Sequence, residues 1–460
     1  MTRPHRRPAL ARRPARTALA CCLLLLAALM SGGCADRDRE TLVVLGPWTG
    51  AEGVAFEAML KRLDDGTGET YTYKGTRSLR ETLVAQLEAG DPPDVAVLNS
   101  LGELTEYARG NRLEPLDSPG HPPWAPRVDV NGSRRTYWVP LKVDLKSLVW
   151  SKSKSKGKAG GSGGARPRWC VGMASQATSG WPGTDWIEDL VLHRSGPGTY
   201  ARWATGRLSW RSPEVRGAWT AWAELLGERS KKSVDLSLTT SYEGTPDPKA
   251  ARPAPRGLLN SPELDCTHEH QSAFIRYLYA NANGSGGAKG GSDGGVRVDP
   301  SARFLPGPAA HDGAYEVAGD MAAVFSGNPA ARELVERLSG SAARRLWHEE
   351  AEPELRPFFP GAGDPQPTDP GGGEAAALLT GKADTLCFDA SDAMPPALRD
   401  AFHRAVLRYF RDPSGDRLDT LLGQLDTVRA ETGGTTGDSP GGASGGGLPP
   451  DAVCAPPSDG

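Results

Sequence analysis

The chain has 460 residues, more than one ordinary hydrophobic core accommodates, and this length predicts two or three domains. Its 38% hydrophobic and 24% charged residues are typical of a soluble globular protein, whereas 57 glycines and 39 prolines predict linker segments. The formal net charge of −3 excludes the strongly basic surface that a nucleic-acid-binding protein needs.

The first 33 residues form a segment of their own. Six arginines, at positions 3, 6, 7, 12, 13 and 16, precede the apolar run "TALACCLLLLAALM" and the small residues "SGG". An apolar run of about 14 residues is shorter than the roughly 20 that cross a bilayer, so the segment predicts a removable secretory signal rather than a permanent span. Its removal takes away six arginines and no acidic residue, which changes the formal charge from −3 to −9.

The residues "MSGGC" at the end of this segment resemble the lipobox of bacterial lipoproteins. The resemblance implies that Cys34 becomes the lipid-acylated first residue of the mature chain. Ser31 stands where the lipobox usually has a leucine-like residue, and Met30 lies one place earlier. The paired arginines lie outside a full twin-arginine motif, so we expect general secretion.

In residues 41–100, segments with the hydrophobic pattern of strands alternate with segments that have the pattern of helices. We predict strands in "TLVVLGPWTG" (41–50), "TYTYKGT" (70–76) and "DVAVLNS" (94–100), and helices at 52–63 and at 78–90, where Gly90 ends the second helix. This alternation predicts a parallel α/β sheet with helices on both faces. Ligands bind beyond the carboxyl ends of such strands, where Trp48 with Thr49, Gly75 with Thr76, and Asn99 with Ser100 collect.

The rest of the chain predicts a second lobe with insertions. Residues 135–151 are expected to form a long, partly buried pair of strands that leads from one lobe into the other. We predict flexible or low-complexity segments at 152–168 and 283–295 and a disordered segment from 431 onward. Helical patterns cover 184–194, 213–227, 328–351, 394–411 and 415–431, and 272–280 has the pattern of a strand.

Metal-ligand residue types gather in one place, "CTHEH" at 266–270. The three possible ligands, Cys266, His268 and His270, occupy alternating positions of a strand-like segment, in which successive residues point to opposite faces. No second cluster in the sequence completes a zinc site. We therefore favour a disulfide cysteine beside ordinary surface histidines and expect no metal and no cofactor. Beyond Cys34, an exported chain retains four cysteines, at 170, 266, 387 and 454, which allow three pairings.

Signatures of catalysis are missing. The chain has no Gly-x-Ser-x-Gly elbow, Walker loop, Cys-x-x-Cys pair or His-Glu-x-x-His helix. Asp185 and Glu188 lie one helical turn apart and could serve as the acid and base of a glycosidase. We prefer a helix start in which Thr184 is the N-cap and Asp185, Glu188 and Asp189 complement the helix dipole, with Asp185 also available to a ligand. We therefore expect no enzyme.

Twelve tryptophans are many for a chain with 7% aromatic residues. An indole combines a flat apolar face with an N–H edge, which suits the stacking face and hydroxyl groups of a sugar. Trp219, Trp222 and Trp347 lie in helical patterns and are expected in the core. For Trp48 and Trp181 the core is also the default, with sugar stacking as the alternative.

Several stretches together resemble a known family: "GPWTGAEGVAFEAML", "LEAGDPPDVAVLN", "YWVPLKVDLKSLVW", "WCVGMASQATSGWPGTDWIEDLVL", "CTHEHQSAFI", "AGDMAAVF" and "DASDAMPPAL". They are similar to the extracellular solute-binding proteins of carbohydrate ABC importers, in the branch described as binding alpha-glucosides. The blocks "WPGTDW" and "DASDAMP" are the most specific to that branch. The resemblance runs in the expected order across residues 41–430.

This resemblance implies a type II periplasmic-binding-protein-like fold of two α/β lobes that close around a small saccharide and deliver it to an ABC permease. The receptor would be a monomer outside the cytoplasm, held at the membrane by Cys34. The resemblance also implies a disulfide between Cys170 and Cys266. The implied ligand-binding residues are Trp48, Thr49, Lys142, Asp144, Trp181, Asp185, Gly319 and Asp320.

The chain order of such proteins predicts lobes made of separate segments. After the signal, 1–33, lobe 1 takes residues 34–145 and 313–345, and lobe 2 takes residues 146–312 and 346–430, with 431–460 as the disordered tail. Three segments depart from the family pattern: 152–168 in place of a helix, "TTSYEGTPDPKAARPAPRG" (239–257) and the insertion 283–295. They motivate an alternative, a diverged binding fold that acts as a sensory or interaction module at the cell surface without transport.

Overall fold

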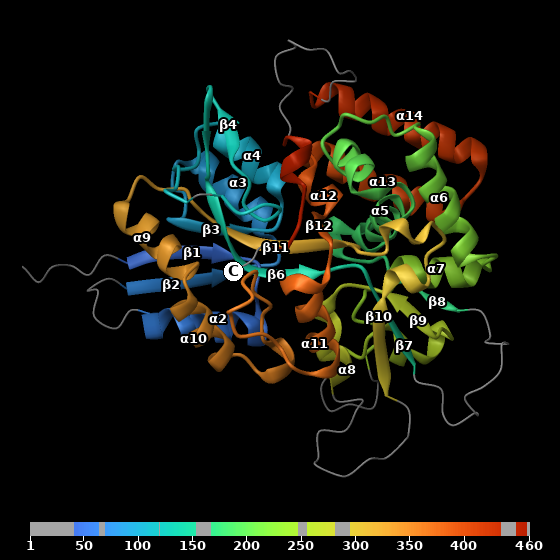
Figure 1. Ribbon diagram of the computed structural model, residues 1–460, viewed down its shortest axis with the longest axis horizontal. Helices are drawn as coiled ribbons and strands as arrows, with labels where there is room; N and C mark the ends of the chain where they lie inside the picture. The colour runs from blue at the N-terminus through green and yellow to red at the C-terminus, as the bar shows by residue number, and fades with distance from the viewer. Residues whose placement is uncertain are drawn as a thin grey trace, which may run out of the picture.

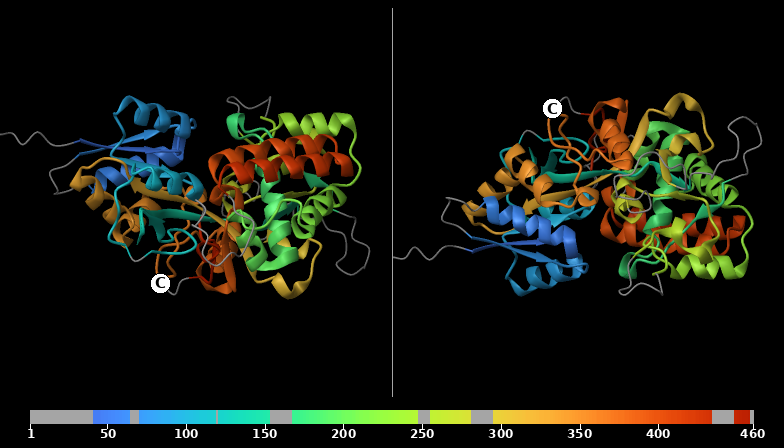
Figure 2. Two further views of the ribbon diagram at one scale, coloured as in Figure 1. Left: turned by 90° about the horizontal axis from the view of Figure 1, so that it is seen from above. Right: turned by 90° about the horizontal axis from the view of Figure 1, so that it is seen from below.

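Two lobes lie side by side in the computed structural model, joined by strands that run between them (Figures 1 and 2). The structure describes residues 41–63, 70–118, 120–152, 167–246, 255–280, 295–433 and 448–457. The predicted signal, Cys34, most of the segments 152–168 and 283–295, and residues 434–447 and 458–460 of the predicted tail lie outside these ranges. Within them, no helix is long and apolar enough to span a bilayer.

Lobe 1 begins as the sequence predicts. Strands β1 (Thr41–Gly46), β2 (Thr70–Gly75) and β3 (Val95–Leu98) alternate with helices α2 (Gly50–Leu63), α3 (Leu79–Ala89) and α4 (Leu101–Arg109). Strand β1 pairs in parallel with β2 on one side and with β3 on the other. Gly90 ends α3 in the left-handed conformation, at φ 73°. The parallel arrangement predicted for these three strands is confirmed, but the sheet continues as a mixed one, because β11 (Ala314–Val324) pairs antiparallel with β3.

Strands β6 (Trp138–Leu145) and β11 (Ala314–Val324) connect the lobes. They are antiparallel to each other, and β11 pairs with β3 of lobe 1 through residues 321–324 and with β12 (Thr385–Phe388) through residues 314–317. The two strands thus run through the junction, as Figure 1 shows at the centre of the molecule. The crossover predicted at 135–151 is confirmed as β6 followed by β7 (Leu148–Lys152).

Lobe 2 contains a smaller sheet in the order β10, β7, β9, β8, packed with helices. The strands are β8 (Trp169–Cys170), β9 (His268–His270) and β10 (Val296–Pro300), and the helices are α5 (Trp181–Ala204), α6 (Pro213–Leu226), α7 (Lys231–Thr239), α13 (Pro396–Arg411) and α14 (Gly415–Glu431). Trp219 and Trp222 are fully buried in its core, and Trp347 is buried in lobe 1, so all three core predictions are confirmed.

Short elements complete the described chain. They are β4 (Val128–Val130), β5 (Ser133–Arg135), α8 (Tyr277–Ala280), α11 (Pro370–Ala377), α12 (Ala390–Ala393) and β13 (Cys454–Ala455).

Two secondary-structure predictions are wrong. Residues 272–280, expected as a strand, form a 3-10 turn (Ala273–Arg276) followed by α8, because Asp144 accepts the backbone N–H of Phe274 and holds this segment against β6. The single helix expected at 328–351 is divided into α9 (Pro329–Leu338) and α10 (Ser341–Glu350). Helix α10 packs on α2 in the lobe 1 core, so lobe 1 extends beyond residue 345.

The end of the chain is more ordered than the composition predicts. Residues 448–457, expected as part of a disordered tail, place Leu448 and Val453 in the core, and β13 pairs with β12 at the edge of the large sheet. Cys454 forms a disulfide with Cys387, which settles the pairing that the sequence left open. The buried apolar side chains and the disulfide together hold a segment whose glycine and proline content predicts disorder.

Candidate ligand-binding site between the lobes

One face of β6 carries charged residues at every second position. Lys142, Asp144 and Lys146 alternate along the strand and its end, and residues two apart in a strand point to the same side. On the neighbouring strand β11, Asp320 lies opposite Lys142. The strands that join the lobes therefore present a charged stripe at the junction.

The lobe 1 end of this stripe is an ion-pair group. Lys142 Nζ lies 3.1 Å from Glu52 Oε1, at the start of α2, and 3.5 Å from Asp320 Oδ2. Burial acts to lower the pKa of Lys142, but the two carboxylates outweigh it and leave the pKa above its ordinary value. Burial also raises the pKa of Asp320, against the opposing effect of Lys142. Lys142 and Asp320 keep 19% and 16% of their side-chain surface exposed, so charged groups of both signs at one point offer donors and acceptors to a polar ligand.

Trp48 is part of the lobe 1 core. Only 3% of its surface is exposed, and its ring packs against Phe56 and Trp347 at centroid distances of 4.7 and 4.8 Å. Its Nε1 donates to Asp320 Oδ2 at 3.0 Å, and Lys142 Nζ lies 5.2 Å from the ring centre. The structure therefore assigns Trp48 the core position that was its default, with an indirect link to the site through Asp320. Thr49 follows it, half-buried, in the loop before α2.

Asp144 fixes the segment that faces it from lobe 2. Its carboxylate accepts the Ser272 hydroxyl at 2.8 Å and the backbone N–H of Phe274 at 3.2 Å. Burial raises the pKa of Asp144 to about 6, although these hydrogen bonds and Lys142 act to lower it. Both oxygens are used within the protein, since Oδ1 accepts the N–H of Leu145. Asp144 thus positions the segment of Ser272 and Phe274 next to the site, and its own oxygens are already hydrogen-bonded within the protein.

Trp181 is the half-buried tryptophan of the junction and the first residue of α5. Gly180 precedes it at φ 109°, and a Cβ there would lie 2.5 Å from the carbonyl oxygen of His403, so this close turn needs glycine. The Trp181 ring lies 5.8 Å from Tyr242 and 6.2 Å from Phe274, measured between ring centres. These three rings form an aromatic group beside the charged stripe.

Residues of lobe 1 reach this aromatic group. Arg77, in the loop between β2 and α3, acts to lower the pKa of Tyr242, which burial raises above its ordinary value. The charge of Glu52 contributes to the raised pKa of Tyr277, for which burial is the main cause. Arg77 and Glu52, two charged residues of lobe 1, are therefore near enough to the aromatic group to act on its tyrosine neighbourhood.

Asp185 does not act as predicted at the helix start. Helix α5 begins at Trp181, and the Thr184 hydroxyl donates to the Trp181 carbonyl, so Thr184 is not the N-cap. Asp185, Glu188 and Asp189 are instead buried, each with a specific partner. Asp185 Oδ1 accepts from Lys146 Nζ at 2.8 Å, Glu188 accepts the N–H of Ala390, and Asp189 accepts the Ser147 hydroxyl. The dipole interpretation of these three residues is wrong, because the helix starts one turn earlier.

Four carboxylates of the described chain come close enough to share a metal ion: Asp185, Glu188, Glu316 and Asp389 lie within 4.8 Å of one another. The ammonium group of Lys146 lies among them, hydrogen-bonded to Asp185 and Asp389 and 3.8 Å from Glu316 Oε1. Burial raises the pKa of Glu188 and of Glu316 well above the ordinary value, which favours their neutral forms. With a lysine already at the centre, we treat the group as an ion-pair network.

Gly319 and the predicted disulfide have structural roles. A Cβ on Gly319 would lie 2.8 Å from the Met321 side chain and 3.0 Å from the Lys142 carbonyl oxygen, so the glycine allows β11 to pair closely with β6. Cys170 and Cys266 form the disulfide that the resemblance implies. His270, expected at the surface, is buried and lies 2.8 Å from Asp189 Oδ2, because β9 is covered by α5.

The chain matches no protein-family model. It is 28% identical over 393 residues to the alpha-glucosides-binding periplasmic protein AglE of Rhizobium meliloti (strain 1021), which covers 78% of this chain and 81% of that protein. It is 26% identical over 428 residues to the osmoprotective compounds-binding protein GgtB of Synechocystis sp. (strain PCC 6803), with 83% and 91% covered. Both relatives are named as binding proteins, and the similarity to them extends over 78% and 83% of this chain.

A solved structure confirms the fold of this chain. The bacterial solute receptor AcbH, described as preferring b-D-galactopyranose, superposes with a TM-score of 0.59 over 85% of this chain and 99% of its own, at 15% identity. At this identity the likeness shows the fold alone. The predicted two-lobed type II architecture is therefore confirmed.

The sequence alone did not indicate Lys146 or the ring partners of Trp181. The alternation "KVDLK" at 142–146 is a signal that could have identified Lys146, since it extends the charged face of β6 by one position. Tyr242 lies in a segment that departs from the family pattern, and nothing local marks it as a neighbour of Trp181.

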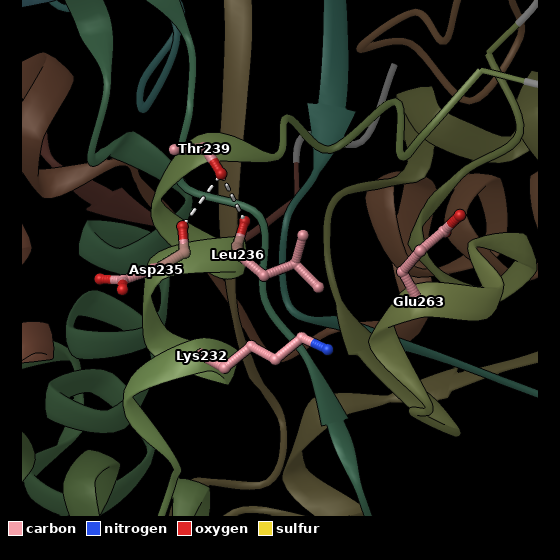
Figure 3. Close-up of a pocket in the computed structure, with 5 residues that line it drawn as sticks. All are labelled: Lys232, Asp235, Leu236, Thr239 and Glu263. Carbon is pink, nitrogen blue, oxygen red and sulfur yellow. Dashed lines mark hydrogen bonds between the residues drawn. The ribbon is translucent and has the colours of Figure 1, made fainter.

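A hollow lies on the surface of lobe 2, at helix α7. It is open, has a volume of about 470 Å³, and is lined by Lys232, Asp235, Leu236, Thr239 and Glu263. Figure 3 shows Lys232 and Leu236 on α7 with Glu263 on the facing turn. None of the predicted site residues lines it, and it offers no aromatic face, so it lacks the features expected of a saccharide site.

Proposed function

We propose that this chain is a solute-binding protein that captures a small saccharide of the alpha-glucoside kind between its lobes and delivers it to the membrane-embedded part of an ABC importer. The observation that carries the proposal is the half-buried ring of Trp181, grouped with Tyr242 and Phe274 beside the charged stripe of β6. Aromatic faces stack on sugar rings, and the charged groups hydrogen-bond to hydroxyls. The names of the two relatives support a small polar ligand.

Lobe closure is the expected mode of capture. Lobes joined by short crossovers close over a ligand by hinge motion, and here β6 and β11 are such crossovers. Of the eight predicted ligand-binding residues, we assign direct contact to Lys142, Trp181 and Asp320. Trp48, Asp144, Asp185 and Gly319 support them, and Thr49 stays a prediction.

Export and anchoring complete the proposal. We expect residues 1–33 to be removed and Cys34 to carry the lipid that keeps a monomeric receptor outside the cytoplasm, near its permease. Replacement of Cys34 by Ser should release the protein from the membrane fraction. Mass spectrometry of the wild-type N-terminus should show an acylated cysteine, and an unmodified one would contradict anchoring.

The alternative, a diverged surface module without transport, rests on the segments that depart from the family pattern. Tyr242 comes from one of these segments and still contributes a ring beside Trp181, which favours a retained ligand site. Relatives of the chain are binding proteins, which argues against the glycosidase alternative.

The test is thermal melting of the chain from residue 35 onward with a panel of saccharides that includes maltose, trehalose, raffinose and galactose. A saturable rise in melting temperature without sugar breakdown supports capture. No shift with any saccharide would favour the diverged module, and appearance of product sugars would indicate an enzyme.

A further inference from the structure

Lys146 connects the two parts of lobe 2 that face lobe 1. Its Nζ donates to Asp185 Oδ1, in the helix that starts with Trp181, and to Asp389, the residue that caps α12. Only 6% of Lys146 is exposed, so its charge depends on these partners. The same Nζ lies 5.9 Å from the centre of the Trp181 ring.

The start of α5 has no side-chain cap. Its N-cap is Gly180, which has no side chain to accept the first N–H groups. Asp185 lies one helical turn beyond Trp181, so the Lys146 ion pair anchors the turn that carries the indole. The second oxygen of Asp185 has no hydrogen-bond partner among the described residues, which leaves Lys146 as the main contact of this carboxylate.

Helix α12 links the same lysine to lobe 1. Asp389 accepts the Asp392 N–H at 2.9 Å, and Asp392 Oδ2 accepts the Asn99 side chain at 2.9 Å. The Asp392 carbonyl accepts the Ser100 hydroxyl at 3.0 Å. A chain of contacts therefore runs from Lys146 to the loop between β3 and α4 of lobe 1.

We propose that Lys146 is a positioning residue of the saccharide site, which holds the Trp181 turn of α5 and the lobe-facing helix α12 in register through Asp185 and Asp389. The inference rests on the proposed function for its effect on affinity. The orientation of Trp181 can be measured without any ligand, so the two proposals fail separately.

The first measurement is the ¹⁹F spectrum of the ligand-free chain labelled with 5-fluorotryptophan, with the Trp181 resonance assigned from a Trp181→Phe variant. Lys146→Met and Asp185→Asn should each shift or broaden that resonance, and the double variant should add no further change. Lys146→Arg, which retains the charge, should restore much of the wild-type position. Arg429→Met is the matched control, because Arg429 is also buried in lobe 2 and bonded to a carboxylate, Asp426, on α14.

The second measurement is calorimetric titration with maltose, or with the panel saccharide that gives the largest melting shift. Lys146→Met should weaken binding by about tenfold, whereas Arg429→Met should leave it unchanged. An unmoved Trp181 resonance in Lys146→Met, or wild-type affinity in that variant, would overturn the proposal. If Lys146→Met does not fold, Asp185→Asn decides it by the same two criteria.

Discussion

Trp48 Nε1 donates to Asp320 Oδ2 at 3.0 Å, across 272 residues of sequence. The bond joins the loop after β1 to the crossover strand β11. The same oxygen, Asp320 Oδ2, also lies 3.5 Å from Lys142 Nζ. Trp48 therefore acts on the site by fixing Asp320, whereas Trp181 offers its own ring. Two tryptophans with the same predicted role therefore differ: Trp48 lies in the core, and Trp181 is half-buried and is the one to which we assign a ligand contact.

Replacement of Trp48 by Ala should mainly destabilise lobe 1. Removal of a buried tryptophan side chain costs about 3–5 kcal/mol of unfolding free energy. Urea unfolding, monitored by circular dichroism, measures the loss. A variant with wild-type stability and no saccharide binding would place Trp48 in the site instead.

Replacement of Trp181 by Ala should mainly weaken saccharide binding. The side chain is half-buried, and its ring contacts are worth about 1–2 kcal/mol of stability, whereas a central stacking residue contributes at least about 2 kcal/mol to binding. Trp169→Ala is a matched control, because Trp169 is also a half-buried lobe 2 tryptophan with ring contacts, to Trp186 and His268. The control should lose stability without losing affinity.

The stability of lobe 2 should depend on pH through Glu269. Burial raises the pKa of Glu269 to about 8 from an ordinary 4.5, with the Tyr279 hydroxyl acting in the opposite direction. Between these values the folded chain holds one more proton than the unfolded chain, so the unfolding free energy falls as pH rises, by at most about 1.4 kcal/mol per pH unit.

The Glu269→Gln variant has no titratable group at this position, so this difference in proton binding between the folded and unfolded chain is lost. Its unfolding free energy should therefore fall less than that of the wild type between pH 7 and 8, and it should be the more stable of the two above pH 8. Urea unfolding at these pH values makes the comparison. Parallel wild-type and variant curves across this interval would show that Glu269 titrates near its ordinary pKa.

The C-terminal disulfide should stabilise the large sheet. Cys387 and Cys454 are 67 residues apart, and loss of a disulfide typically costs about 2–4 kcal/mol. Cys454→Ser and Cys387→Ser should lower the melting temperature equally, and the double variant should match the single ones. A chain that ends at residue 433 loses both the disulfide and the buried side chains of Leu448 and Val453. If its melting temperature falls further than that of the single variants, the additional fall is due to Leu448 and Val453.

Local patterns predicted lobe 1 well because each of its strands and helices carries its own period. Asn99 and Ser100, predicted at the carboxyl ends of the parallel strands, hydrogen-bond to Asp392 of lobe 2. Residues 272–280 could not be predicted in this way, because the apolar and aromatic residues that favour a strand are held in a turn by Asp144, about 130 residues earlier.

Local sequence patterns also could not predict which individual residues are buried. Trp48 and Trp181 both follow glycine-containing loops, and only the packing of α10 against α2 buries the former. Asp185, Glu188 and Asp189 have the composition of a helix start, yet their partners come from two distant segments, Lys146 and Ser147 after β6 and Ala390 in α12. A sequence shows which residues can pair, and the tertiary structure decides which do.

Calorimetric titration of the panel saccharides into the chain from residue 35 onward tests saccharide capture most directly. We predict saturable one-to-one binding of at least one alpha-glucoside, weakened at least about 30-fold by Trp181→Ala and unchanged by Trp169→Ala. No binding of any saccharide, or equal affinity in wild type and Trp181→Ala, would contradict a saccharide site at the lobe junction.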